Sequence, residues 1–428
     1  MGLDNPRRVA LQILDACLGR KVALDRAFDG AAVELEGRDR AFARTLVATT
    51  LRHLGQIDVI CEKYLRRPIP KKALTVRNIL RLGVAQVIFL KTPPHAAVGE
   101  TTALADHRAT QNYRGLINAV LRRVTEAGNS LLVEQDAARL NTPGWLWESW
   151  IKSYGRELAR EIANAHLTEP PLDLTIFTQT AEEWGALLDG EILPTGSVRR
   201  KSGGRIETIA GFDEGAWAPQ DAAAALPVRL FGDVSGKLII DLCAAPGGKT
   251  AQLAAGGADV TAIDLNERRL QRLNSNLQRL NLTAKTVVAD ALEWMPEKEA
   301  DGVLLDVPCS ATGTIRRHPD LPWAKSTSEV KALLPIQAQM LRSAAKMIKP
   351  GGLLIYACCS LQPEEGERQI SQFLKHHPDF SRRPITATDS LGIPEAITAA
   401  GDLRTLPSMW TSIGSIDGFY ASRLVKKR

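Results

Sequence analysis

The sequence predicts an all-α bundle at the N-terminus and an α/β domain at the C-terminus, with a small α+β insert between them. Three observations lead to this prediction. Apolar residues recur at helical spacing from residue 5 to about 127. A proline pair at 170–171 is followed by alternating apolar residues. After Gly236, short apolar strands alternate with helices, as in a parallel sheet covered by helices.

Residues 1–130 are expected to form the helical bundle. Apolar residues recur at helical spacing in Val9–Leu14, Phe42–Val47 and Val76–Leu82, and prolines at 68, 70, 93 and 94 separate the helices. The region carries 21 lysines and arginines against 12 aspartates and glutamates, whereas the whole chain has a net charge of +6. This excess of positive charge predicts a polyanionic partner, although a solvated helix surface would have the same composition.

Two segments connect the bundle to the C-terminal domain. Residues 131–168 are predicted to be a helical connector that is packed by its tryptophans. Residues 169–233 are predicted to be a small α+β subdomain, because Leu172–Phe177 alternates like a strand and Asp221 is suited to the start of a helix.

Residues 234–428 are predicted to form the α/β domain around a buried parallel sheet. The expected strands are Lys237–Leu242, Val260–Asp264, Thr286–Asp290, Gly302–Asp306 and Leu353–Ala357, and the expected helices are Thr250–Ala255, Glu267–Leu280 and Leu333–Ile348. Ligands of such sheets bind beyond the carboxyl ends of the strands. The residues that follow each strand are therefore the candidates for a binding site.

A loop of small residues follows the first of these strands. Its residues are Cys243, Ala244, Ala245, Pro246, Gly247, Gly248 and Lys249. The two glycines allow a ligand to approach the backbone closely, and the next helix begins with the positive end of its dipole. A phosphate-binding P-loop is excluded, because that motif requires glycine where this chain has Cys243.

Acidic residues end three of the expected strands, at Asp264, Asp290 and Asp306. Asp264 follows Asp241 by 23 residues, a position from which a carboxylate can accept hydrogen bonds from ribose hydroxyls. The loop lacks the G-x-G-x-x-G pattern of nicotinamide dinucleotide sites. A nucleoside held by two strand-end carboxylates fits S-adenosylmethionine better. For each aspartate by itself, capping of the next helix is the alternative.

The six cysteines, at positions 17, 61, 243, 309, 358 and 359, show no metal-ligand spacing. No run approaches the ~18 apolar residues of a membrane span, so we expect a cytoplasmic protein with reduced thiols. Cys309 and Cys359 lie 50 residues apart, and each follows an expected strand. Both thiols should therefore face one crevice. Cys358 should point to the other side of its strand and fill the core.

Four blocks of the sequence resemble the signatures of the Sun-type RNA 5-methylcytosine methyltransferases: Asp241–Thr250, Asp306–Ser310, Tyr356–Ser360 and Asp417–Tyr420. The N-terminal helices, with Pro94–Glu100 and Gly115–Arg122, look like the NusB-type RNA-binding domain of one bacterial branch of that family. That branch acts on small-subunit (16S) ribosomal RNA. The resemblance spans nearly the whole chain and implies a Rossmann-like class I methyltransferase domain.

The resemblance implies an enzyme that methylates carbon 5 of a cytosine in ribosomal RNA, uses S-adenosylmethionine and contains no metal. Its cofactor contacts fall on residues 243–249, Asp264, Asp290 and Asp306. Its nucleophile falls on Cys359 and its second cysteine on Cys309. The family usually has threonine at the position of Cys358, so the attacking thiol is one of two neighbours, and the spacing to Ser360 favours Cys359.

The chemistry explains why such a site contains two thiols. Carbon 5 of cytosine is a poor nucleophile, and a thiolate that adds to carbon 6 makes an enamine that can attack a methyl donor. Asp306 is expected to bind the exocyclic amine and, when protonated, the ring nitrogen. Cys309 is expected to assist the release step as base or proton relay, with a merely buried cysteine as the alternative.

Arg316 and Arg317 are expected to hold RNA phosphates at the mouth of the pocket, unless they belong to a plain solvated loop. A monomer without membrane contact is expected. Three other functions stay open from the sequence. They are a DNA cytosine-5 methyltransferase, which would attack with Cys309, an RNA-binding antitermination or assembly factor with a vestigial methyltransferase domain, and a methyltransferase that acts on transfer RNA.

Overall fold

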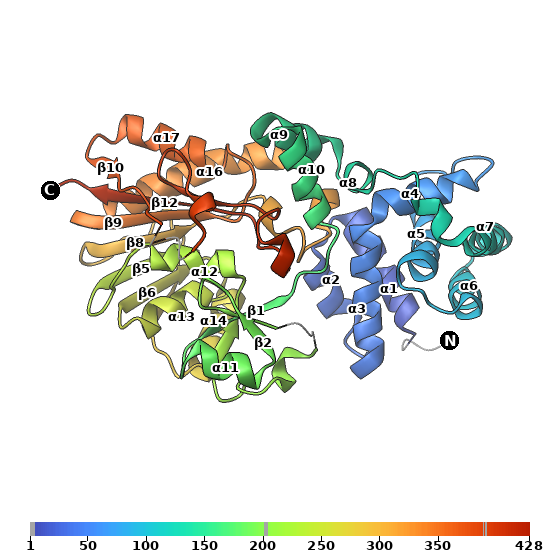
Figure 1. Ribbon diagram of the computed structural model, residues 1–428, viewed down its shortest axis with the longest axis horizontal. Helices are drawn as coiled ribbons and strands as arrows, with labels where there is room; N and C mark the ends of the chain where they lie inside the picture. Colours follow the sequence, from blue (N-terminus) through green and yellow to red (C-terminus); the bar gives the residue numbers. More distant parts are fainter. Residues whose placement is uncertain (1–4, 201–203, 388, 390–391) are drawn as a thin grey trace. The chain divides into compact units, whose positions relative to one another are not determined.

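The structure is a computed structural model that describes residues 5–200, 204–387, 389 and 392–428 (Figure 1). The chain forms two compact units. The first contains Met1–Glu169 and Ile315–Ser326, and the second contains Pro170–Thr314 and Thr327–Arg428. The expected connector, residues 131–168, lies in the first unit, and the expected subdomain lies in the second from residue 170 onward.

The first unit is all-helical in its described residues, as predicted. Its helices are α1 (Pro6–Leu14), α2 (Leu24–Ala31), α3 (Gly37–Arg52), α4 (Leu54–Lys63), α5 (Leu74–Val84), α6 (Pro94–Ala103), α7 (Arg114–Ala127), α8 (Ala137–Leu140), α9 (Gly144–Tyr154), α10 (Arg156–Ala165) and α15 (Leu321–Ala324). Ile13, Leu46, Ile79 and Leu121 belong to one core that joins four of these helices. No helix in the described part of the chain is long and apolar enough to cross a membrane.

The start of α1 shows how the sequence sets a helix boundary. Asn5 Oδ1 accepts a hydrogen bond from the Arg7 amide at 2.9 Å, and Pro6 occupies the first helical position. Both residues suit this place, because the first amides of a helix have no acceptor within the helix. Val9 and Ile13, which lie one turn apart, are buried in the core.

The segment Ile315–Ser326 belongs to the first unit, although the residues on both sides of it belong to the second. Asp320 Oδ2 accepts a hydrogen bond from the Leu24 amide at 3.1 Å. Trp323 Nε1 donates a hydrogen bond to the Leu51 carbonyl at 2.9 Å. Nothing in the local sequence pattern predicts this placement.

A mixed sheet forms the centre of the second unit, with the order β10-β12-β9-β8-β5-β6-β7, and β11 pairs with β12. The strands are β5 (Leu238–Leu242), β6 (Asp259–Asp264), β7 (Lys285–Val288), β8 (Ala300–Asp306), β9 (Ile348–Cys358), β10 (Phe380–Arg382), β11 (Leu403–Thr405) and β12 (Phe419–Lys426). The five strands from β9 to β7 are parallel, as predicted. The antiparallel edge made by β12, β10 and β11 is an addition to that prediction.

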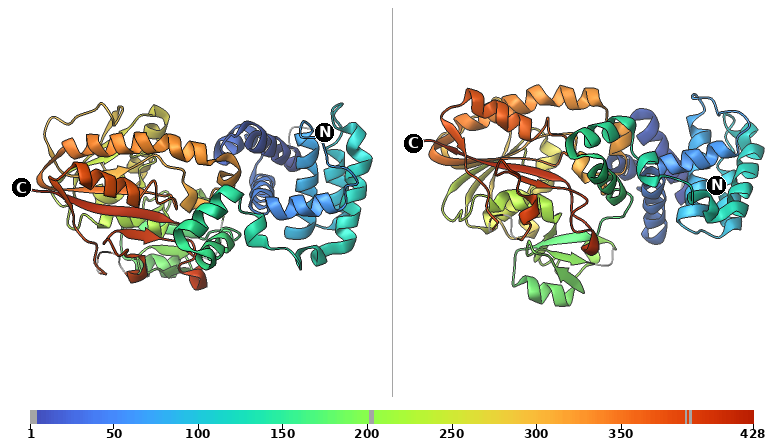
Figure 2. Two further views of the ribbon diagram at one scale, coloured as in Figure 1. Left: turned by 90° about the horizontal axis from the view of Figure 1, so that it is seen from above. Right: turned by 45° about the horizontal axis from the view of Figure 1, so that its top comes forward.

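Helices cover both faces of this sheet (Figures 1 and 2). They are α12 (Ala222–Arg229), α13 (Gly248–Ala255), α14 (Glu267–Arg279), α16 (Thr327–Lys346) and α17 (Glu367–His376). Side chains alternate between the faces of a strand. Ile240 accordingly shares a core with Met340 of α16, whereas the preceding Ile239 shares a core with Leu226 of α12.

The strand order reverses at β5, which lies between β6 and β8. The connections that leave the carboxyl ends of β5 and β8 therefore run in opposite directions and open a crevice between them. Both the small-residue loop after β5 and the Asp306–Ser310 block after β8 lie at this crevice.

The subdomain before the sheet is the predicted α+β element. It contains β1 (Leu172–Ile176), α11 (Ala181–Leu187), β2 (Gly190–Ile192), β3 (Val198–Arg200) and β4 (Trp217–Pro219), in the antiparallel order β2-β3-β1-β4. A buried ion pair joins β1 to β3: Arg199 Nε and Nη2 lie 2.6 and 2.7 Å from the two carboxylate oxygens of Asp173. The two side chains are 3% and 0% exposed.

We expect Asp173→Ala to lower the free energy of unfolding by about 3–5 kcal/mol, because it leaves the Arg199 guanidinium buried without its carboxylate. Urea denaturation followed by tryptophan fluorescence measures the change, since Trp217 lies on the neighbouring strand β4. The matched control is Arg205→Ala, which removes an exposed ion pair with Glu207 and should change stability little. Equal effects of the two variants would contradict the prediction.

Candidate active site

Strands β8 and β9 are parallel neighbours. A cysteine follows each strand at the same edge of the sheet, Cys309 after β8 and Cys359 after β9. Asp306, the last residue of β8, pairs with Ala357 of β9. Beyond these residues, Cys309 Sγ lies 3.5 Å from Cys359 Sγ, and both side chains are half-buried. Two residues far apart in sequence thus form one thiol pair.

Glycine at position 313 allows the two loops to approach each other. The Gly313 amide donates a hydrogen bond to the Cys359 carbonyl at 2.9 Å, and the Gly418 amide donates to the Gly313 carbonyl at 2.9 Å. A Cβ atom at position 313 would lie 1.9 Å from the Gly418 carbonyl oxygen, so no larger residue fits without moving the backbone. Three segments of the chain therefore meet at the thiol pair.

Cys358 points away from the crevice. Its side chain is fully buried and packs in the core that includes Tyr356 and Tyr420. Its thiol donates a hydrogen bond to the Glu365 carbonyl at 3.5 Å, and burial raises its pKa well above the usual value. Of the two adjacent cysteines, Cys359 is the one that contacts Cys309.

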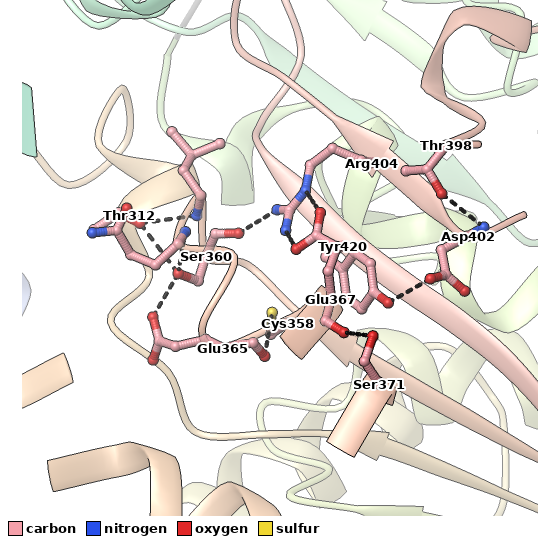
Figure 3. A network of polar contacts seen from close by, with 12 residues as sticks. Thr312, Cys358, Ser360, Glu365, Glu367, Ser371, Thr398, Asp402, Arg404 and Tyr420 are labelled. Atoms are coloured by element: carbon pink, nitrogen blue, oxygen red, sulfur yellow. Dashed lines mark hydrogen bonds and ion pairs between the residues drawn. The ribbon is translucent and has the colours of Figure 1, made fainter. Parts of the chain in front are cut away.

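A buried polar network lies behind the cysteine loops (Figure 3). Ser360, which follows Cys359, donates a hydrogen bond to Glu365 Oε2 at 2.5 Å, and Thr312 Oγ1 accepts a hydrogen bond from the Leu361 amide at 2.9 Å. Arg404 donates to the Ser360 carbonyl and pairs with Glu367 at 2.7 Å. These contacts hold the backbone around Cys359 from the side of the protein interior.

Lys249, the last residue of the small-residue loop, reaches the crevice. Its Nζ lies 2.7 Å from Asp306 Oδ2 and 5.1 Å from the centre of the Phe419 ring. Burial lowers the pKa of Lys249, but the charge and hydrogen bond of Asp306, with the charges of Asp241 and Cys359, raise it more. The net pKa lies above the usual value, so Lys249 is a permanent cation beside the thiol pair.

The thiol of Cys309 holds its proton firmly. Its pKa lies well above the usual value, first because of the hydrogen bond with Cys359, and then because of burial and the charges of Cys359 and Glu365.

The small-residue loop forms one wall of a cavity of about 560 Å³ within the second unit. All seven loop residues from Cys243 to Lys249 line it, together with Asp241 and Asp306. Gly247 adopts a φ of 103°, and a Cβ atom there would lie 2.7 Å from Leu273 Cγ. Only glycine combines this left-handed conformation with so close a neighbour.

Asp241, at the base of this cavity, was not among the predicted contact residues. Its Oδ2 accepts a hydrogen bond from Thr250 at 2.6 Å, whereas its buried Oδ1 has no protein partner in the described part of the chain. Burial raises the pKa of Asp241 to about 7, against the lowering effects of Thr250 and the Lys249 charge.

Asp264 and Asp290 do not line the cavity. Asp264 is buried; it accepts hydrogen bonds from the Ala245 and Asn266 amides at 3.2 and 3.0 Å and lies 3.3 Å from Arg269. Asp290 follows β7 by two residues and accepts a hydrogen bond from the Leu292 amide at 2.9 Å. Both carboxylates thus have local roles in this structure, and Asp264 also supports the small-residue loop.

The structure does not support Arg316 as a phosphate contact. Its side chain is fully buried in the first unit, to which Ile315–Ser326 belongs, and its carbonyl accepts a hydrogen bond from Arg52 at 2.8 Å. Arg317 is half-buried in the same segment. The sequence shows two adjacent arginines near Cys309 but not the interior into which the segment folds.

The sequence did not predict Asp241 and Glu365 as residues of the site. Asp241 is the second-to-last residue of β5 and could have been found by extending the strand-end rule applied to Asp264 and Asp306 by one residue. Glu365 lies among three glutamates, 364, 365 and 367, and no local pattern distinguishes the buried one. Among the described residues, no cluster of three or more His, Cys, Asp or Glu side chains could hold a metal ion.

Comparisons with known proteins agree with the two-part organisation. The family model described as 16S rRNA methyltransferase RsmB/F matches residues 230–425, and the NusB family model matches residues 4–126. Ribosomal RNA small subunit methyltransferase B of Cronobacter sakazakii is 34% identical over 99% of this chain and 99% of its own length. The protein of the same name from Vibrio cholerae is 36% identical over 88% of this chain and 90% of its own length.

Solved structures share the fold. The structure of PH0851 has a TM-score of 0.78 and 24% identity, and covers 98% of this chain and 99% of its own. NSun6 from Pyrococcus horikoshii has a TM-score of 0.56 and 19% identity, and covers 67% of this chain and 98% of its own. Because these structures are less than 25% identical to the chain, they show the fold alone. The full-length relatives, which are more than 30% identical, show the family. The chain belongs to the 16S rRNA methyltransferase RsmB/F family and carries a NusB-family domain at its N-terminus.

Proposed function

We propose that this protein methylates carbon 5 of a cytosine in 16S ribosomal RNA, with S-adenosylmethionine as methyl donor and Cys359 as nucleophile. The contact between the two thiols, 3.5 Å apart beside the Lys249–Asp306 ion pair, carries the proposal. One thiol suffices to activate the base. A second thiol in contact with the first offers a group for the later release of the product.

The first step needs a thiolate, and it needs groups that stabilise the negative charge when that charge passes from the sulfur to the cytosine ring. Cys359 Sγ forms a bond to carbon 6 of the cytosine, the electrons of the carbon 5–carbon 6 double bond shift through carbon 4 to ring nitrogen 3, and that nitrogen gains a proton. The product is an enamine whose carbon 5 is nucleophilic. Asp306, at the end of β8, would accept a hydrogen bond from the exocyclic amine and, when protonated, donate its proton to the ring nitrogen, which stabilises the adduct. Lys249 keeps a positive charge near the sulfur.

Carbon 5 would then form a bond to the methyl group of the donor while the bond from that group to the sulfonium sulfur breaks, and ring nitrogen 3 would lose its added proton. The last step restores the aromatic ring. Cys309, as a thiolate, takes the proton from the methylated carbon 5. The electron pair of that bond rebuilds the double bond between carbons 5 and 6, and the bond from carbon 6 to Cys359 breaks and returns its electrons to sulfur. The position of Cys309 against Cys359 supports this role, because the base must reach the carbon next to the one that carries the adduct.

The cavity beside the small-residue loop fits S-adenosylmethionine. Asp241 Oδ1 is a buried acceptor without a protein donor, and the amino group and ribose hydroxyls of this molecule are donors. When bound, S-adenosylmethionine supplies an electrophilic methyl group. Residues Cys243–Lys249 and Asp306 would hold it, and we keep Asp264 and Asp290 as further contacts.

The first unit supports ribosomal RNA as the partner. It matches the NusB family, and residues 1–130 carry 21 basic against 12 acidic side chains. Phosphate contacts from such a surface add affinity without sequence preference. The target cytosine must then leave its stack to reach the thiol pair. With this substrate, the enzyme acts in the cytoplasm, where ribosomal RNA is made.

We expect Cys359→Ala to reduce methyl transfer to 16S ribosomal RNA at least about a thousand-fold, because the variant lacks the nucleophile. Cys309→Ala should instead accumulate a covalent enzyme–RNA adduct, because addition proceeds and release does not. Incorporation of labelled methyl groups into transcribed 16S RNA, and gel electrophoresis under denaturing conditions, measure the two effects.

Cys358→Ser is the matched control for these variants, because its hydroxyl can still donate to the Glu365 carbonyl. Its activity should stay within a few-fold of the wild type. A Cys359→Ala enzyme with normal turnover would refute the assignment of the nucleophile, and methylation of transfer RNA in place of 16S RNA would refute the substrate.

We expect the affinity for S-adenosylmethionine to rise with pH through about 7, the pKa of Asp241. The donor carries positive charge, so it binds the ionised carboxylate better than the neutral acid. Titration calorimetry at pH 6, 7 and 8 measures this dependence. Asp241→Asn should bind more weakly and lose the dependence, whereas Asp259→Asn, an exposed residue at the other end of β6, should keep it. An unchanged pH dependence in Asp241→Asn would contradict the prediction.

A further inference from the structure

Glu365 is a fully buried carboxylate in the loop between β9 and α17. Its oxygens accept four hydrogen bonds, and each donor is a neutral group: the Ser310 amide, the Ser310 and Ser360 hydroxyls, and the Gln337 side-chain amide. A buried charge is costly unless hydrogen bonds satisfy it. A carboxylate retained at this cost, directly behind the thiol pair, calls for a functional explanation.

Glu365 joins the two cysteine loops. Ser310 directly follows Cys309, and its amide and hydroxyl donate to Glu365 at 2.9 and 2.5 Å. Ser360 directly follows Cys359, and its hydroxyl donates to Glu365 at 2.5 Å. The carboxylate therefore sets the distance between the loops, and Figure 3 shows the Ser360 side chain directed at it.

Other contacts fix Glu365 itself. Gln337 of α16 donates to its Oε1 at 3.0 Å and to the Pro308 carbonyl at 3.0 Å. The Glu365 carbonyl accepts hydrogen bonds from the Tyr356 hydroxyl at 2.6 Å and from the Cys358 thiol at 3.5 Å. Contacts on both its side chain and its backbone leave the carboxylate one position.

The charged and titratable groups around the thiol pair are distributed unequally. Lys249, Asp241 and Asp306 lie on the side of the cavity, and Tyr356 and Cys358 belong to β9. Glu365 lies behind both loops, and Arg404, which is paired with Glu367, donates a hydrogen bond to the Ser360 carbonyl. The cation Lys249 interacts with Cys359, whereas the negative charge of Glu365 acts on Cys309. A negative sulfur is therefore better placed at Cys359 than at Cys309.

We propose that Glu365 is a positioning residue whose buried negative charge keeps the proton on Cys309 and so leaves Cys359 as the attacking sulfur. This inference rests on the proposed function, which assigns the roles of the two thiols. It adds the group that makes the two thiols chemically different. Both cysteines follow strand ends and precede a serine, so their own sequence does not make one of them the nucleophile.

The same arrangement orders the two steps of the reaction. Before the addition, Cys309 holds its proton in its contact with Cys359, and it is not a base. When Cys359 forms its bond to carbon 6, its negative charge disappears, and with it the hydrogen bond that contributes most to the high pKa of Cys309. Cys309 can then lose its proton to water and later accept the proton of carbon 5.

The test is the rate at which iodoacetamide alkylates each cysteine in the full-length enzyme, followed by mass spectrometry of the two peptides from pH 6 to 9. In the wild type, Cys359 should react first and Cys309 only at higher pH. In Glu365→Gln, removal of the charge should lower the pKa of Cys309 and raise its alkylation rate at pH 8 about tenfold. An unchanged Cys309 rate in this variant would overturn the proposal.

Glu364→Gln is the matched control. It removes the neighbouring carboxylate, which is 33% exposed and pairs with Arg368, and it should leave both alkylation rates as in the wild type. A tenfold rise of the Cys309 rate in this control as well would show that surface charge accounts for the effect, which also overturns the proposal.

Glu365→Asp is the second variant, for the case that Glu365→Gln does not fold. It keeps the charge on a shorter side chain, so Cys309 should react as slowly as in the wild type, and faster alkylation would mean that packing rather than charge protects it. Alkylation needs neither RNA nor methyl donor. If the wild-type enzyme did not methylate RNA, the proposed function would be refuted. The alkylation rates of Cys309 and Cys359 would still test the role of Glu365.

Discussion

The parallel pairing of β8 with β9 is the constraint on which the rest of the site depends. Its register, with Asp306 beside Ala357, sets the points at which the two cysteine loops leave the sheet. The side chains of a strand alternate between its faces, so a shift of one residue would present Cys358 in place of Cys359. The Gly313 amide, bonded to the Cys359 carbonyl, holds the loops together where the strand hydrogen bonds end.

Charges of opposite sign on either side of the thiol pair make two similar cysteines different. Lys249 lies on the side of the cavity and is held by Asp306, while Glu365 lies on the side of the core and is held by neutral donors. Such interactions are stronger in a protein interior than in water, because little solvent screens them. The same interior makes an unsatisfied charge costly, so Lys249 is paired with Asp306 and the Glu365 carboxylate accepts four hydrogen bonds.

The sequence predicted most of the fold and part of the site. Periodicity separated the helical unit from the α/β unit, and residues at strand ends pointed to one crevice, because the carboxyl ends of parallel strands share an edge. The sequence did not indicate that Arg316 is buried, since its segment folds into the first unit through contacts with residues far away in the chain. The sequence also did not predict that β12 joins the sheet as an antiparallel strand. The aromatic residues of this strand do not indicate the direction in which it pairs.

By itself, the sequence determined the order of helices and strands, the loop Cys243–Lys249 and the placement of Cys309 and Cys359 at one sheet edge. These properties are local, because they follow from apolar spacing and from the residues that end each strand. Only the tertiary structure decided that Glu365 is buried while Glu364 pairs with Arg368 and Glu367 with Arg404. Three nearby glutamates have the same intrinsic chemistry. Glu364 has a local partner four residues away, whereas Ser310 and Gln337, which bind Glu365, and Arg404, which binds Glu367, lie far away in the chain.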